Sequence, residues 1–221
     1  MKISTSFRHR AFVLSAVFVT LLVFSCSGDK STDIGDGETP DLSNPDSLLR
    51  FLAKSYADKD LDGYDVCLDE SFLFIFTDDI ADLLGLPVSE PWWGKTEDLN
   101  STRMMFDDPS VESVMFAYEV VGEWVDTTVV RPDTSFSGFF RRIDPLIEVV
   151  TATENPEDPE LVFRVDGSWL DVMVVPDRFW EGHWCILSIQ EVEKQPFKAL
   201  PASASAGTEP GTWGAIKSMW H

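Results

Sequence analysis

The hydrophobic positions of this chain recur every three to four residues in its first half. Such spacing is typical of amphipathic helices, and the pattern predicts one over 46–59 with Asp46 as its cap. Its apolar positions are Leu48, Leu49, Leu52, Ala53 and Tyr56. Further helices are predicted over 61–68 and 95–106, with a helical turn over 78–86. An unbroken apolar run over 72–76 predicts a strand covered on both faces, and 91–94 is expected to be a loop.

The second half changes to a period of two. Apolar and polar residues alternate over 113–120, 146–152, 161–175 and 184–192, which predicts an antiparallel sheet. The polar stretches 127–137 and 154–160 are expected to be loops. Asp166–Gly167 is either a hairpin turn or a bulge within one long strand, and we favour the bulge because bent strands curl a sheet round a helix.

The order of these elements predicts the fold class. Helices come first and strands follow, which favours an α+β domain over a parallel α/β one. Beyond a linker over 201–211, the residues Trp213, Ile216 and Trp220 form one apolar stripe. We expect this stripe to belong to a short helix that docks back on the domain.

The first residues carry a targeting signal. Lys2, Arg8 and Arg10 precede an apolar run over 11–24 that is too short to span a bilayer, and Cys26 follows. This arrangement resembles the leader of bacterial lipoproteins, in which the cysteine after the cut carries lipid. Val23 and Phe24 depart from the usual pattern, which favours Leu and then a smaller residue. An ordinary secretory leader cut near Ser25 and a retained anchor are the alternatives.

These features divide the chain into four expected parts. They are a lipoprotein signal peptide over 1–25, a flexible acidic tether over 26–44, a folded domain over 45–194, and a linker with a short C-terminal helix over 195–221. The lipid on Cys26 would be the membrane contact. Because Ser27 is not the Asp that resembles an inner-membrane retention signal, the outer membrane of the cell envelope is favoured over the inner one.

Charge narrows the range of partners. The formal net charge is −21, and removal of residues 1–25 takes away three basic and no acidic residues, which leaves −24. Such a field repels nucleic acid, so we expect no nucleic-acid partner. Cys67 and Cys185 remain after lipidation of Cys26, and they could either pair or stay as buried free thiols.

Several short motifs carry a resemblance to a known family. They are the inter-helix segment 58–64, the strand Phe72-Leu73-Phe74, the dipeptide Trp93-Gly94 before a helix, and Trp184-x-Ile186 in the last strand. Together they resemble the nuclear transport factor 2-like superfamily, whose cone-shaped fold is shared with ketosteroid isomerase and polyketide cyclases. The resemblance covers about 45–193. It implies N-terminal helices packed in the concave face of a curved antiparallel sheet.

The resemblance also implies a deep, largely apolar mouth in the cone. Its candidate lining residues are Tyr56, Tyr64, Trp92, Trp93, Tyr118 and Trp169. We favour a non-enzymatic envelope lipoprotein whose cone binds a small apolar ligand or docks an envelope protein, with no cofactor. The alternative is a small isomerase, dehydratase or hydrolase that uses an Asp/Tyr pair. A buried carboxylate within hydrogen-bond reach of a tyrosine would indicate the enzyme.

A second alternative is a calcium-binding loop. Asp58, Asp60, Asp62 and Asp69 match the ligand spacing of such a loop, with Gly63 at its sixth position. Asp65 and Val66 depart from the pattern, and Asp69 replaces the longer Glu at the last position. The same residues are also explained as an inter-helix turn with a capping Asp and a Gly.

Overall fold

A computed structural model describes residues 40–153, 161–165, 167–194 and 210–221, and these belong to one compact unit that begins at Thr39. The leader, Cys26, most of the expected tether, the loop 154–160 and most of the linker lie outside the described residues. Within the described part of the chain, no helix is both long and apolar enough to cross a membrane.

The helices precede most of the sheet, as predicted. They are α1 (Pro45–Ala57), α2 (Leu61–Val66), α3 (Asp78–Leu83) and α4 (Lys95–Asp107). The cap of α1 is Asn44 and not Asp46, because the Asn44 side chain accepts a hydrogen bond from the Ser47 backbone N–H at 2.9 Å. Pro45 then occupies the first turn, where its missing N–H costs nothing. The apolar stripe of α1 is buried as expected.

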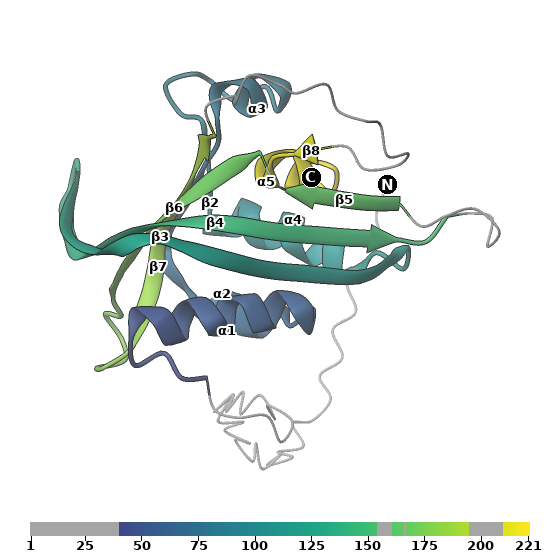
Figure 1. The fold of residues 1–221 in the computed structure, drawn as a ribbon. Helices are drawn as coiled ribbons and strands as arrows, with labels where there is room; N and C mark the ends of the chain where they lie inside the picture. The colour runs from purple at the N-terminus through teal and green to yellow at the C-terminus, as the bar shows by residue number, and fades with distance from the viewer. Residues whose placement is uncertain (1–39, 154–160, 166, 195–209) are drawn as a thin grey trace, which may run out of the picture. The chain divides into compact units, whose positions relative to one another are not determined.

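The strands form one strongly curved sheet (Figure 1). They are β1 (Leu68–Ile75), β2 (Trp92–Gly94), β3 (Val111–Arg131), β4 (Thr134–Thr151), β5 (Leu161–Val165), β6 (Ser168–Pro176), β7 (Trp184–Glu193) and β8 (Pro210–Gly211). β3 pairs with one edge of β4, and the order continues from β4 through β6, β7 and β1 to β2. The strands predicted in the second half, β3 to β7, pair antiparallel as expected. β1–β7 and β5–β8 are parallel, so the sheet as a whole is mixed, which the sequence did not predict. A hairpin turn forces the two strands that it joins to pair antiparallel, but no hairpin joins β1 to β7 or β5 to β8.

Two segments predicted as loops are strands. Residues 92–94 pair with β1, and 127–137 form the outer ends of β3 and β4 with only Pro132–Asp133 in the turn. The outer ends are polar because much of their surface faces solvent. Two positions of the hairpin require glycine. Gly122 adopts a φ of 103°, and a Cβ at Gly138 would lie 2.0 Å from the Val174 carbonyl oxygen.

The favoured bulge between β5 and β6 is confirmed. Val165 pairs with Ile147 and Leu170 pairs with Ile143, so β5 and β6 follow one another along the same edge of β4 with one extra residue between them. The two strands do not pair with each other, which rules out the hairpin turn. The extra residue bends this edge of the sheet and adds to its curl.

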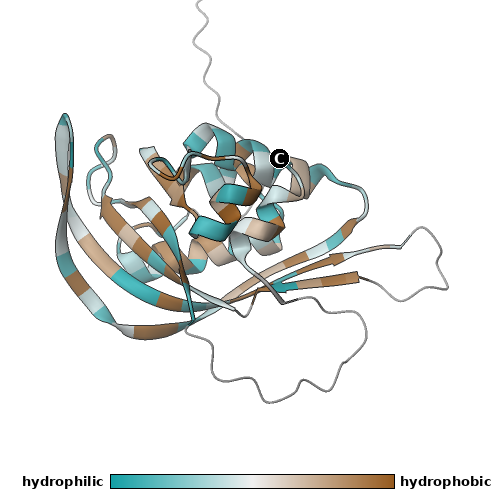
Figure 2. Ribbon diagram, turned by 90° about the horizontal axis from the view of Figure 1, so that it is seen from above, coloured by the Kyte–Doolittle hydropathy of each residue, from teal (hydrophilic) through white to brown (hydrophobic). Residues whose placement is uncertain are grey.

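The main core lies in the concave side of the sheet, where the helices pack (Figure 2). The expected α+β class, with N-terminal helices in the concave face of a curved sheet, is confirmed. The short helix α5 (Trp213–Ser218) joins this core, since Trp213 and Ile216 are buried in it and Trp220 packs against it. The predicted docking of this stripe is therefore also confirmed.

A smaller apolar cluster lies apart from the main core. It consists of Phe136, Met173, Val175, Cys185 and Leu187. Cys67 belongs to the main core instead, and both thiols are buried and free. Of the two alternatives, the structure therefore shows buried free thiols: Cys67 is the C-cap of α2 and Cys185 lies on β7, and their side chains enter different clusters.

Candidate functional site

The centre of the concave side holds a fully buried polar group. The Tyr64 hydroxyl on α2 donates a hydrogen bond to Asp98 Oδ2 on α4 at 2.5 Å. Lys217 Nζ on α5 pairs with the other oxygen, Asp98 Oδ1, and lies 3.2 Å from the Tyr64 hydroxyl. The side chains of Asp98 and Lys217 are both 0% exposed. The enzyme hypothesis requires a buried carboxylate within hydrogen-bond reach of a tyrosine, and the structure contains one. A lysine is paired with the same carboxylate.

The surroundings fix the charge of this group. Burial raises the pKa of Tyr64 well above its usual value, and the Asp98 charge raises it further, so the hydroxyl keeps its proton. Burial alone would lower the pKa of Lys217, but the Asp98 carboxylate outweighs it and the pKa is raised. An ionised lysine therefore balances the Asp98 charge, and each carboxylate oxygen already accepts a hydrogen bond, so neither oxygen faces a space from which a substrate proton could be taken.

α5 is fixed at its other end by Glu191 of β7. Its carboxylate accepts a hydrogen bond from the Gly214 backbone N–H at 2.9 Å, while Oε2 has no partner in the described structure. Burial raises the pKa of Glu191 to about 7, against the lowering effect of the backbone N–H groups of Gly214 and Trp213. A Cβ at Gly214 would lie 2.5 Å from the Phe76 ring, so only glycine allows the helix to approach this closely.

Aromatic packing completes the filling of the concave side. The Trp213 ring lies 5.3 Å from the Tyr56 ring, which in turn lies 5.0 Å from Tyr64 and 5.5 Å from Phe116. The Ser101 hydroxyl also donates to the Lys217 carbonyl oxygen at 2.8 Å. Side chains of α5 thus fill part of the concave side of the sheet.

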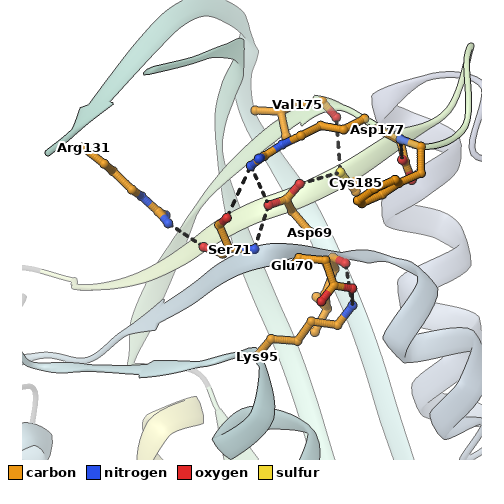
Figure 3. Close-up of polar contacts among 11 residues, drawn as sticks. Asp69, Glu70, Ser71, Lys95, Arg131, Val175, Asp177 and Cys185 are labelled. Carbon is orange, nitrogen blue, oxygen red and sulfur yellow. Dashed lines mark hydrogen bonds and ion pairs between the residues drawn. The ribbon is translucent and has the colours of Figure 1, made fainter. Parts of the chain in front are cut away.

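A second polar cluster lies at the start of β1 (Figure 3). Asp69 is 6% exposed and accepts hydrogen bonds from the Ser71 backbone N–H at 2.8 Å and from Arg178 at 3.2 Å. Cys185 Sγ lies 3.7 Å from Asp69 Oδ2, and burial with the Asp69 charge raises the pKa of this thiol to about 12. Arg131, from the tip of the β3–β4 hairpin, donates to the Ser71 carbonyl oxygen at 2.6 Å.

An open groove of about 510 Å³ borders this cluster. It runs between β1 and the start of α4, and its lining includes Asp65, Glu70, Lys95, Glu97 and Arg131. Lys95 donates to the Leu68 carbonyl oxygen at 2.9 Å and pairs with Asp65 and Glu70. Its side chain is only 14% exposed, whereas those of Asp65 and Glu70 are 48% and 73% exposed. The accessible charge contributed by these ion pairs is therefore acidic.

The predicted pocket residues do not share a pocket. Tyr56, Tyr64 and Trp93 are buried in the core, where Tyr56 and Tyr64 meet each other, while Trp93 packs on Phe76 and on the ring of His221. The others lie elsewhere: Trp92 is exposed, Tyr118 is half-buried beside Phe116, and Trp169 lies under Arg142. The structure thus places three of the six candidates in the core and the other three at separate positions, and it does not bring all six together around one cavity among the described residues.

The four candidate calcium ligands do not converge. Asp58 pairs with Lys54, Asp60 caps α2 by accepting from the Gly63 backbone N–H at 2.9 Å, and Asp69 faces Arg178. Asp62 is an exposed residue in the first turn of α2. Among the described residues, no three His, Cys, Asp or Glu side chains are grouped as a metal site would need. The inter-helix turn is the correct interpretation of this segment.

Sequence reasoning missed Asp98, Lys217 and Glu191. Lys217 stands four residues after Trp213 and therefore on the same side of a helix as the apolar stripe, which is a signal that it is buried. Glu191 stands two residues after Ile189 in the period-two stretch 184–192, so it shares a strand face with Leu187 and Ile189, which is also a signal of burial. Asp98 carries no comparable signal, because it is one of many acids in an acidic chain.

Comparison with known proteins gives similarity at the level of the fold. No model of a known protein family matches this sequence, and no curated protein sequence is significantly similar to it. Similar solved structures include a conserved protein from Planctomyces limnophilus (14% identity, 67% of this chain and 94% of that one, TM-score 0.43). A nuclear transport factor 2-like superfamily protein from Salmonella enterica is also similar (8% identity, 70% of this chain and 92% of that one, TM-score 0.41). ActVI-ORFA from Streptomyces coelicolor is similar as well (13% identity, 66% of this chain and 92% of that one, TM-score 0.39).

Proposed function

We propose that this chain is an envelope lipoprotein, anchored through Cys26, whose cone-shaped domain docks a partner protein and catalyses no reaction. The observation that carries this proposal is the filled concave side. Trp213 and Lys217 of α5 occupy it, and the carboxylate and hydroxyl of the Asp98–Tyr64 pair are satisfied by each other and by Lys217. A ligand would have to displace α5 before it could enter.

The open groove beside β1 is the proposed docking site. β2 pairs only with Leu73–Ile75, so Glu70–Phe72 of β1 have no neighbour from β2, and an extended polypeptide segment could lie there. The exposed Asp65, Glu70 and Glu97 favour a basic segment. The net charge of −24 after processing would steer the same kind of partner toward the domain.

Two measurements test this proposal. Native mass spectrometry of the protein extracted from membranes should find lipid on Cys26 and no other small molecule, because the interior is filled. A photo-reactive residue at Thr96, inside the groove, should give one discrete protein adduct in cells. A small molecule bound in the folded domain would contradict the docking role.

Charge reversal provides the matched control. The pair Glu70→Lys and Glu97→Lys should abolish the Thr96 adduct, because both side chains line the groove. The pair Glu112→Lys and Glu119→Lys makes the same change in net charge on exposed positions of β3 and should leave the adduct intact. Equal loss in both variants would mean that net charge, and not the groove, determines binding.

The enzyme alternative has one observation in its favour, the Tyr64–Asp98 hydrogen bond of 2.5 Å. It requires that α5 leave the concave side, so that Lys217 no longer neutralises Asp98. Removal of 212–221 would expose the pair, and turnover that appears only in this truncated chain would support the alternative.

A further inference from the structure

The turn between β6 and β7 presents two large aromatic side chains to solvent. Phe179 is 78% exposed and Trp180 is 55% exposed. Among the described residues, the only other exposed large aromatic side chain is Trp92, at 39%. The other exposed large apolar residues are Val, Leu and Met side chains, which most protein surfaces carry. An adjacent Phe–Trp pair at the tip of a turn is different and needs a physical reason.

This turn is held in place by its own hydrogen bonds. Asp177 Oδ1 accepts from the backbone N–H of Phe179 at 2.6 Å and from that of Trp180 at 3.1 Å. The Asp177 N–H donates to the His183 carbonyl oxygen at 2.9 Å, which closes the turn, and Gly182 adopts a φ of 84°. The Trp180 ring also packs edge-on against His183 at 5.7 Å. The aromatic pair is therefore fixed in its exposed position.

The turn lies where the chain enters the domain from the proposed anchor. The Trp184 N–H, directly after the turn, donates to the Leu42 carbonyl oxygen at 2.9 Å, and Leu42 is buried. In Figure 1 the β6–β7 turn and the start of α1 lie at the same end of the sheet. The described residues begin at this end with Pro40, which is fourteen positions after Cys26, so only a short length of chain separates this turn from the proposed lipid attachment.

We propose that Phe179 and Trp180 insert into the interface of the lipid bilayer and hold the domain against the membrane that carries its anchor. Rings of Trp and Phe are favoured at the headgroup level, where the apolar body is buried and the indole N–H stays in contact with water. Asp177, Arg178 and Glu181 flank the pair, and the Arg178 guanidinium is paired with Asp69. The charge left beside the rings is therefore acidic, so the surface that fits them is zwitterionic and not strongly anionic. This inference rests on the proposed attachment at Cys26.

The test supplies the attachment chemically. The chain beginning at Cys26 is coupled through that thiol to phosphatidylcholine vesicles that contain a small share of maleimide lipid. Cys67 and Cys185 are buried, and burial raises the pKa of Cys185 to about 12, so neither should react. Vesicles with brominated acyl chains then quench the fluorescence of any tryptophan that enters the bilayer.

The difference in emission between the original chain and Trp180→Phe gives the contribution of Trp180 alone. Brominated lipid should remove most of the emission that distinguishes the original chain from Trp180→Phe. The matched control is Trp92→Phe, which removes another exposed tryptophan, located on β2. The emission that distinguishes the original chain from Trp92→Phe should be the same with and without bromine. Phe179→Ser should weaken the quenching of Trp180, and replacement of part of the phosphatidylcholine by phosphatidylglycerol should weaken it too.

Unquenched Trp180 emission on coupled vesicles would overturn the proposal, as would equal quenching of Trp92 and Trp180. Because the anchor is supplied by the maleimide lipid, either result stands whether or not cells attach lipid to Cys26. The intact mass of the protein from membranes decides that separate question, so failure of the anchor and failure of the aromatic contact can be distinguished.

Discussion

Two buried aspartates of this protein form ion pairs with basic side chains in very different surroundings. Asp98 is 0% exposed and its partner Lys217 is equally buried, so the pair lies entirely inside the concave core. The Asp69 side chain is 5% exposed, but its partner Arg178 is 48% exposed and reaches it from the β6–β7 turn. The first pair attaches α5 to the core, while the second lies at the border of an open groove and of the aromatic turn.

The comparison separates a structural site from an accessible one. Both carboxylates have hydrogen-bond donors and nearby sulfur or aromatic groups, and either could be mistaken for a catalytic acid on geometry alone. Only the Asp69 cluster can be reached by a partner without unfolding part of the chain. Substitutions at the two pairs should therefore differ in size and in kind.

The largest effect is expected from Lys217→Met. This change leaves the Asp98 carboxylate buried without its counter-charge, which should lower the free energy of unfolding by about 3–5 kcal/mol. Urea denaturation measures it. The double variant Asp98→Asn with Lys217→Met removes both charges and keeps an acceptor for Tyr64, so it should recover most of the loss. A single variant as stable as the original chain would mean that α5 is not attached through this pair.

Glu191 should give the next largest effect, as a dependence of stability on pH. Its pKa in the folded state is about 7, above the usual 4.5, so the folded state binds the proton more tightly than the unfolded state does. Stability from this group is therefore present at low pH and is lost as pH rises from about 4.5 to 7, by about 3 kcal/mol in all.

Glu191→Gln should remove this part of the pH dependence, because the amide is neutral at every pH and can still accept from Gly214. The difference in unfolding free energy between the variant and the original chain should grow in favour of the variant from pH 4.5 to 7 and stay constant above. A difference that does not change with pH would show that Glu191 titrates normally in the folded state.

The sequence predicted the local elements better than their assembly. The periods of three to four and of two placed α1, α4 and most strands, because these periods follow directly from which face of an element is buried. They failed for 127–137, where the hairpin extends beyond the sheet and its Thr and Ser residues face solvent. They also failed for the parallel pairing of β1 with β7, since no local signal sets the direction of strands far apart in sequence.

The candidate site was harder to predict, for a physical reason. Aromatic residues were chosen as pocket lining, yet Tyr56, Tyr64 and Trp93 fill the core, which is the commoner role of large side chains. Asp98 differs from the other acids only in burial, and its burial arises from the docking of a helix more than a hundred residues later in the chain. Such long-range contacts leave no trace in local spacing.

Arg178→Ala should have a smaller effect than Lys217→Met. It leaves Asp69 without one donor, but the Ser71 N–H remains and water can replace a half-exposed guanidinium, so we expect a loss of about 1 kcal/mol in unfolding free energy. Lys54→Ala is the control at the exposed pair with Asp58 and should cost less than about 0.5 kcal/mol. A loss at Arg178 as large as that at Lys217 would remove the contrast between the two sites.

The smallest effect is expected from calcium itself. Asp60 accepts from the Gly63 N–H as the cap of α2, and Asp58, Asp62 and Asp69 are engaged elsewhere or point to solvent. Asp60→Ala should therefore lower stability by about 1 kcal/mol, and Asp60→Ser should restore most of it, since serine caps helices well but is a poor replacement for a calcium-binding carboxylate. Thermal unfolding with calcium and with chelator should give the same melting temperature for all three chains. A calcium-dependent rise that Asp60→Ser abolishes would mean that these aspartates rearrange to bind the ion, and that the turn between α1 and α2 is not fixed by capping alone.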